Sequence, residues 1–106
     1  MTNFHKLTIS GEEYRLRLTV GAILSIEKKL GKSLYTALEN IQDNIVETMT
    51  TILWGALQPL NGDISFSKAL EIFDQYIDEG HSIDDMMQEL NAMFEVSGFF
   101  NKGQAA

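Results

Sequence analysis

The 106-residue sequence contains no cysteine, which excludes disulfide bonds and thiolate metal sites. It also lacks a run of about 18 apolar residues, so we expect no membrane-spanning helix. Because no signal-peptide pattern is visible either, we expect a cytoplasmic protein. Basic residues are scarce: eight lysines and arginines stand against fifteen acidic residues, for a net charge of −7. This balance argues against nucleic acid as a partner, since phosphate binding needs a basic face.

The patterns of common catalytic and metal sites are missing as well. The sequence contains no glycine-rich phosphate loop, nucleophile elbow or HExxH motif, and the acidic residues of 74–79 do not follow the calcium-loop pattern. The two histidines are His5 and His81. Asp84 and Asp85 follow His81, but acidic residues are already favoured in the first turn of a helix. We therefore expect no enzyme, no cofactor and no metal site.

The charge is distributed unevenly along the chain. Residues 1–32 carry six basic and three acidic side chains, a net +3, and residues 33–106 carry two basic and twelve acidic ones, a net −10. A solvated acidic face is the simpler interpretation. The alternative is a dipolar molecule whose basic end meets the acidic end of a neighbouring copy or a basic partner.

The length and the 44% hydrophobic content predict one domain over residues 1–106. We expect an α+β fold that is mostly α, with an N-terminal β-hairpin packed on a bundle of about five helices. The hairpin is expected at residues 4–18, the helical part at 19–98, and a polar tail at 99–106.

The hairpin is predicted from apolar residues that alternate with polar ones, the period of a β-strand. Gly11 and Glu12 fit a two-residue turn with glycine first. This turn would place Leu7 opposite Leu16, and all the apolar side chains would share one face.

The expected helices are marked by residues suited to N-caps, namely Thr19, Ser33, Asn44, Ser65 and Ser82. In the first helix, the spacing predicts an apolar side made of Val20, Ile23, Leu24 and Leu30, with Ile26 at its edge. In the helix after Ser65, one face is lined by Phe66, Ala69, Leu70, Phe73, Tyr76 and Ile77.

The segment Asn44 to Leu60 is apolar over so wide an arc that we expect it to be the central helix, packed on more than one side. Asn44 and Glu47 have the spacing of a capping box. The helix should end before Pro59, because the residue preceding proline avoids helical dihedral angles. Trp54 points away from the main stripe, and we expect the hairpin or the last helix to cover it.

The last predicted helix is rich in methionine and is followed by two phenylalanines. Ordinary core packing is the simpler interpretation. The alternative is an adaptable protein-binding surface, because methionine repacks easily around different partners. The candidate interaction residues on this alternative are Met93, Phe94, Phe99 and Phe100.

Several segments together resemble the small tail assembly chaperones of long-tailed bacteriophages and prophages, especially those of Gram-positive hosts. They are ISGEEYRLRLTV, ILSIEKKLGKSL, TMTTILWGALQP, FDQYIDEG and SGFF, and the resemblance spans about residues 7–100. It implies a non-enzymatic assembly factor that coats the tape measure protein and helps bring tail tube subunits to it. The resemblance implies no catalytic residues. A coat of this kind needs many copies, so a homo-oligomer is possible.

A different class of function is a small cytosolic adaptor or regulatory domain. Such a domain would bind one protein stoichiometrically and would not assemble into a coat.

Overall fold

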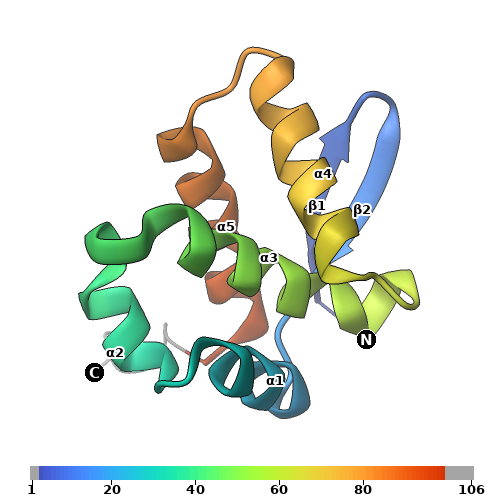
Figure 1. The fold of residues 1–106 in the computed structure, drawn as a ribbon. Coiled ribbons are helices and arrows are strands. Elements are labelled where there is room, and N and C mark those ends of the chain that lie inside the picture. Colours follow the sequence, from blue (N-terminus) through green and yellow to red (C-terminus); the bar gives the residue numbers. More distant parts are fainter. Residues whose placement is uncertain (1–2, 100–106) are drawn as a thin grey trace.

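A computed structural model describes residues 3–99 of the chain. An N-terminal antiparallel hairpin is followed by five α-helices, which confirms the predicted fold class (Figure 1). The elements are β1 (His5–Ile9), β2 (Glu12–Leu16), α1 (Val20–Leu30), α2 (Leu34–Glu39), the 3-10 helix η1 (Ile41–Asn44), α3 (Ile45–Asn61), α4 (Phe66–Asp78) and α5 (Ile83–Ser97).

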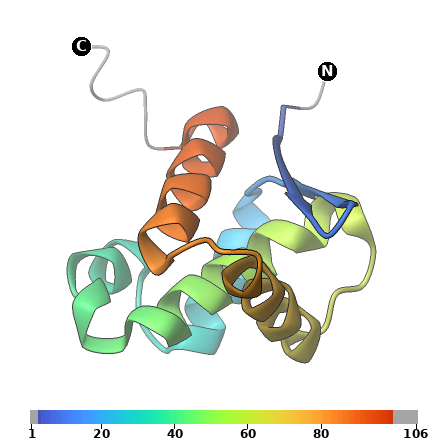
Figure 2. The ribbon, with the colours of Figure 1, turned by 90° about the horizontal axis from the view of Figure 1, so that it is seen from above.

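Helix α3 is the centre of the fold, as its apolar pattern predicts. It contacts α1, α4, α5 and strand β2. In Figure 1, α1 lies below α3 and α4 lies above it; Figure 2, turned by 90°, shows α5 and the hairpin together on a further side. Every residue of α3 from Thr48 to Leu57 except Trp54 is buried. A helix enclosed on so many sides must be apolar around most of its circumference.

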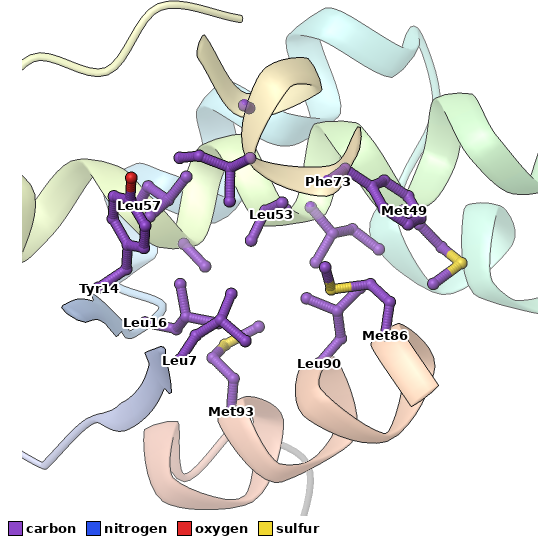
Figure 3. Close-up of a cluster of buried hydrophobic side chains, with 14 of the residues drawn as sticks. Leu7, Tyr14, Leu16, Met49, Leu53, Leu57, Phe73, Met86, Leu90 and Met93 are labelled. Carbon is purple, nitrogen blue, oxygen red and sulfur yellow. The ribbon is translucent and has the colours of Figure 1, made fainter. Parts of the chain in front are cut away.

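The main core lies where α3 meets the hairpin, α4 and α5. Figure 3 shows Met86, Leu90 and Met93 of α5 pointing toward the α3 side chains, with Leu7 and Leu16 of the hairpin beside them. All five of these side chains are at most 1% exposed. The methionines of α5 that are buried therefore serve the core, where their flexible chains fill irregular space.

Four of the five predicted N-caps are confirmed. The side chains of Thr19, Ser33, Ser65 and Ser82 each accept a hydrogen bond from a backbone N–H in the first helical turn. Asn44 makes no such bond, because η1 runs directly into α3 and leaves no free helix start to cap.

Helix α3 continues through Pro59 to Asn61, so the predicted stop before this proline is wrong. Proline removes one backbone donor from the last turn. Other donors serve the carbonyls nearby: Gln58 Nε2 bonds the Trp54 carbonyl at 2.7 Å, and Asn61 Nδ2 bonds the Leu57 carbonyl at 2.8 Å. These side-chain bonds support the turn that contains the proline.

The end of α3 also holds the outer edge of strand β2. The Arg15 backbone N–H donates to Asn61 Oδ1 at 3.0 Å, and Asn61 Nδ2 donates to the Arg15 carbonyl at 2.7 Å. The Arg17 N–H donates to the Ala56 carbonyl at 3.1 Å. A helix end therefore satisfies backbone groups that a third strand would otherwise pair, and the hairpin is fixed to α3.

The hairpin turn is Ser10-Gly11, not the predicted Gly11-Glu12. Both residues have positive φ, 52° and 79°, as a type I′ turn requires. Leu7 consequently pairs with Tyr14 instead of Leu16. The pairing is shifted by two residues, so the predicted apolar face is kept although the predicted register is wrong.

The buried face of helix α1 is rotated relative to the predicted one. Ile23 and Leu30 of the predicted apolar side are partly buried against the core. The most deeply buried residues, however, are Ala22 and Ile26, and Val20 and Leu24 are 73% and 52% exposed. Gly55 of α3 explains this orientation, because a Cβ atom added there would lie 2.4 Å from Ile26 Cγ1. The absent side chain leaves the space into which Ile26 packs.

We predict that Gly55→Ala lowers the free energy of unfolding. Overpacking costs about 1–3 kcal/mol, which exceeds the gain of up to about 1 kcal/mol from the better helix propensity of alanine. The matched control is Gly21→Ala in α1, where the new Cβ would meet only Thr19 Oγ1 at 3.9 Å. Urea unfolding should show a loss for Gly55→Ala and a small gain for Gly21→Ala. Equal stabilisation of both variants would contradict this packing account.

Candidate functional site

The structure separates the four candidate interaction residues predicted from the sequence. Met93 is fully buried and Phe94 is 7% exposed, so both belong to the core. Phe99 is 39% exposed and follows the end of α5. Phe100 lies outside the described residues. Phe99 is therefore the one member of this set that the described structure leaves at the surface.

Trp54 is covered by elements other than the predicted hairpin or last helix. It is half-buried against Phe66 at the start of α4, with ring centroids 6.3 Å apart in an edge-to-face arrangement. The ammonium group of Lys29, from α1, lies 5.4 Å from the Trp54 ring centroid and 4.5 Å from that of Phe66. This cation–π contact joins α1 to α4 across α3.

A largely apolar groove beside α3 and α4 is the strongest candidate for a binding site. It consists of two adjoining hollows of about 390 and 440 Å³ that share the side chains of Val46, Thr50 and Leu70. One hollow extends toward α5, and the other extends toward Lys29 and Phe66. The lining residues of this α3–α4 groove are Lys29, Val46, Glu47, Thr50, Thr51, Phe66, Leu70, Phe73, Asp74, Ile77 and Ile83.

Exposed apolar side chains form the walls of the α3–α4 groove. The exposed fractions are 49% for Val46, 44% for Leu70, 36% for Ile77 and 37% for Ile83. They come from three helices that the fold brings together. A cluster of this kind marks an interaction surface more often than a single exposed leucine does.

The floor of the groove carries a polar group without a partner. Thr50 lines both hollows, is fully buried, and its Oγ1 is the one buried side-chain oxygen or nitrogen between residues 3 and 99 that lacks a hydrogen-bond partner. Leaving a buried hydroxyl unpaired costs about 1–3 kcal/mol.

The open side of the groove is acidic. Asp74 and Glu47 both line it and are exposed, and within the described part of the chain neither forms an ion pair. The one base among the lining residues is Lys29, whose charge lies over the two aromatic rings at one end. The groove therefore combines apolar walls with negative charge at the rim.

The groove results from the width of the apolar arc of α4. Ala69, Ile72, Phe73 and Tyr76 are buried, while Leu70 and Ile77 lie at the margin of this arc and remain exposed. In the sequence, Leu70 and Ile77 belong to the same apolar face as the core residues. Only the placement of α3 and α5 shows that the core does not cover them.

A separate hollow of about 460 Å³ lies between the hairpin and α4. Its lining is mostly polar and includes Glu12, Glu13, Lys68 and Gln75. A polar surface of this kind is expected to be solvated, and its lining residues do not indicate a particular class of ligand.

The main titratable cluster joins β1, α4 and α5. His5 Nε2 donates to Glu89 Oε1 at 2.6 Å, and the Tyr76 hydroxyl donates to Glu89 Oε2 at 3.0 Å. The ring of His81 stacks on Tyr76 at 4.1 Å, and its Nδ1 lies 3.8 Å from Asp85 Oδ2. Both oxygens of Glu89 are thus engaged by side chains of other elements, as expected of a structural junction.

Burial, the hydrogen bond to Glu89 and the charges of Glu89 and Asp85 all raise the pKa of the Tyr76 hydroxyl. The group therefore remains protonated and donates to Glu89. A phenol whose pKa is raised is a poor general base near neutral pH. Among residues 3–99, no three histidine, aspartate or glutamate side chains are arranged to hold a metal ion.

The described chain is thus a small, mostly helical α+β domain with one apolar groove whose rim is acidic. It belongs to the DUF6096 family, a family of unknown function whose model matches residues 4–106. No curated protein and no solved structure matches the chain. None of the helices in the described part is long and apolar enough to cross a lipid bilayer.

We predict that alkaline pH destabilises the protein through Tyr76. The raised pKa of this group contributes stability that is present below the unfolded value of 10.0 and is lost as pH rises toward the folded value. The free energy of unfolding should therefore fall less steeply above that pH in Tyr76→Phe than in the wild type. Glu89→Gln should retain much of the slope, because burial of Tyr76 is the largest cause of the shift. Identical slopes for wild type and Tyr76→Phe would refute this assignment.

Proposed function

We propose that the protein is a non-enzymatic tail assembly chaperone of a long-tailed phage or prophage, acting in the cytoplasm of the bacterial host. In this role it holds helical segments of the tape measure protein in the α3–α4 groove and helps to bring tail tube subunits to them. The observation that carries the proposal is the groove itself, with exposed walls from three helices. The resemblance of residues 7–100 to this family supports the choice of client.

The walls of the groove suit a helix better than a small molecule. Small-molecule sites usually enclose most of the ligand surface, whereas Val46, Leu70, Ile77 and Ile83 remain more than one-third exposed along an open surface. An amphipathic helix places residues at spacings of three and four on one face, and such a face can lie along a groove of this kind.

The charge of the protein also suits a chaperone. The net charge of −7 favours solubility and would help to keep a client complex from aggregating. The acidic rim at Asp74 and Glu47 favours client helices with basic residues beside the apolar stripe.

We predict that Leu70→Ser combined with Ile77→Ser weakens binding of tape measure fragments. The dissociation constant should rise about tenfold or more, because two apolar contacts are lost. A tenfold rise corresponds to a loss of about 1.4 kcal/mol of binding free energy. Isothermal titration calorimetry with a helical tape measure fragment measures this change. Tyr35→Ser is the matched control, since it removes an apolar ring that is 67% exposed on α2, outside the groove.

A parallel titration of Phe99→Ser tests the candidate site predicted from the sequence. Loss of binding in Phe99→Ser with unchanged binding in the groove variant would place the client site at the end of α5 instead. A wild-type protein that binds no tape measure fragment but binds one other host or phage protein at one-to-one stoichiometry would favour the adaptor function.

A further inference from the structure

The side of α1 that faces away from α3 has the chemical character of a docking helix. Val20, Leu24 and Lys28 follow one another at intervals of four residues, so they form one stripe along α1. The buried residues Ala22 and Ile26 lie on the opposite side of the helix. We call Val20, Leu24 and Lys28 the α1 docking face.

The α1 docking face combines exposed apolar side chains with positive charge. Val20 has 73% of its surface exposed, more than any other large apolar side chain among residues 3–99. Lys28 at the end of the stripe and Lys32 beyond the helix are both exposed, and neither makes an ion pair within the described residues. Both charges are therefore available to a partner.

The α1 docking face and the α3–α4 groove are complementary. The groove offers apolar walls at Val46, Leu70 and Ile77 and unpaired carboxylates at Asp74 and Glu47. The docking face offers two apolar side chains and a lysine. The lengths agree as well: Val20 and Lys28 are eight positions apart and Leu70 and Ile77 are seven positions apart, so the two stretches span about 12 Å and about 10 Å along their helices.

One molecule cannot satisfy both surfaces by itself. Helix α1 is fixed to α3 through Ile26 and Gly55, and its docking face points away from that contact. In Figure 1, α1 lies on one side of α3 and α4 on the other. The complementary surfaces therefore belong to different copies of the chain.

We propose that the α1 docking face of one copy occupies the α3–α4 groove of a second copy. The contact is heterologous, because two different surfaces meet, so each copy keeps one free docking face and one free groove. Repetition of the contact produces a ring or an open chain of copies. The uneven charge of the sequence agrees with this contact, because the docking face lies in the basic part, +3 over residues 1–32, and the rim carboxylates lie in the acidic part, −10 over residues 33–106.

This self-association uses the same groove as the proposed client site, so a client helix competes with α1 of the neighbouring copy. The contact itself does not depend on the identity of the client. Its test therefore uses the protein alone, and it can fail or succeed separately from tape measure binding.

The test mixes two variants in which opposite sides of the contact are removed. The first variant, Val20→Ser with Leu24→Ser, keeps the groove and loses the docking face. The second, Leu70→Ser with Ile77→Ser, keeps the docking face and loses the groove. All four substituted side chains are exposed, so both variants should fold, as circular dichroism will verify. Val46→Ser replaces the second variant if that one does not fold.

Sedimentation velocity gives the result. The wild type should form species larger than a dimer as its concentration rises, and each variant alone should stay monomeric. The two variants mixed should form a one-to-one heterodimer and nothing larger, because only one complete contact remains. Tyr35→Ser should associate as the wild type does. A monomeric wild type, self-association of either variant alone, or a mixture that stays monomeric would each overturn the proposal.

Discussion

The close approach of α1 to α3 at Gly55 is the constraint on which the rest of the structure depends. Ile26 enters the space that a side chain at Gly55 would fill. This contact sets the rotation of α1, buries Ala22 and turns Val20 and Leu24 outward. With α1 on that side, the other sides of α3 remain for the hairpin, α4 and α5. Both surfaces proposed to bind proteins follow from this packing.

The features that the sequence predicted correctly are those determined by neighbouring residues. A hydroxyl at Thr19, Ser65 or Ser82 caps the helix that follows because its partner is a backbone N–H only three residues away. The hairpin follows from alternation, and the central place of α3 follows from an apolar arc too wide for a surface helix. None of these inferences requires knowledge of which distant segments meet.

The features that were mispredicted depend on contacts between distant segments. Asn61 reaches back to Arg15 and joins α3 to β2, so the helix does not stop at Pro59. The burial of Ile26 instead of Val20 depends on a glycine 29 positions later in the sequence. The α3–α4 groove is harder still to predict, because Leu70 and Ile77 have the same periodicity as core residues. Only the positions of α3 and α5 leave them uncovered.

The methionine-rich side of α5 thus fills the core, whereas apolar side chains at the margins of α3, α4 and α1 remain exposed, and we propose that these contact other chains. The most direct measurement of these contacts is the methyl NMR spectrum of the wild type over a concentration series. The account predicts that the methyl signals of Val20 and Leu24 shift together with those of Val46, Leu70 and Ile77, while those of the core residues Leu53 and Ile72 stay fixed. Groove signals that do not change, or shifts confined to residues near Phe99, would contradict it.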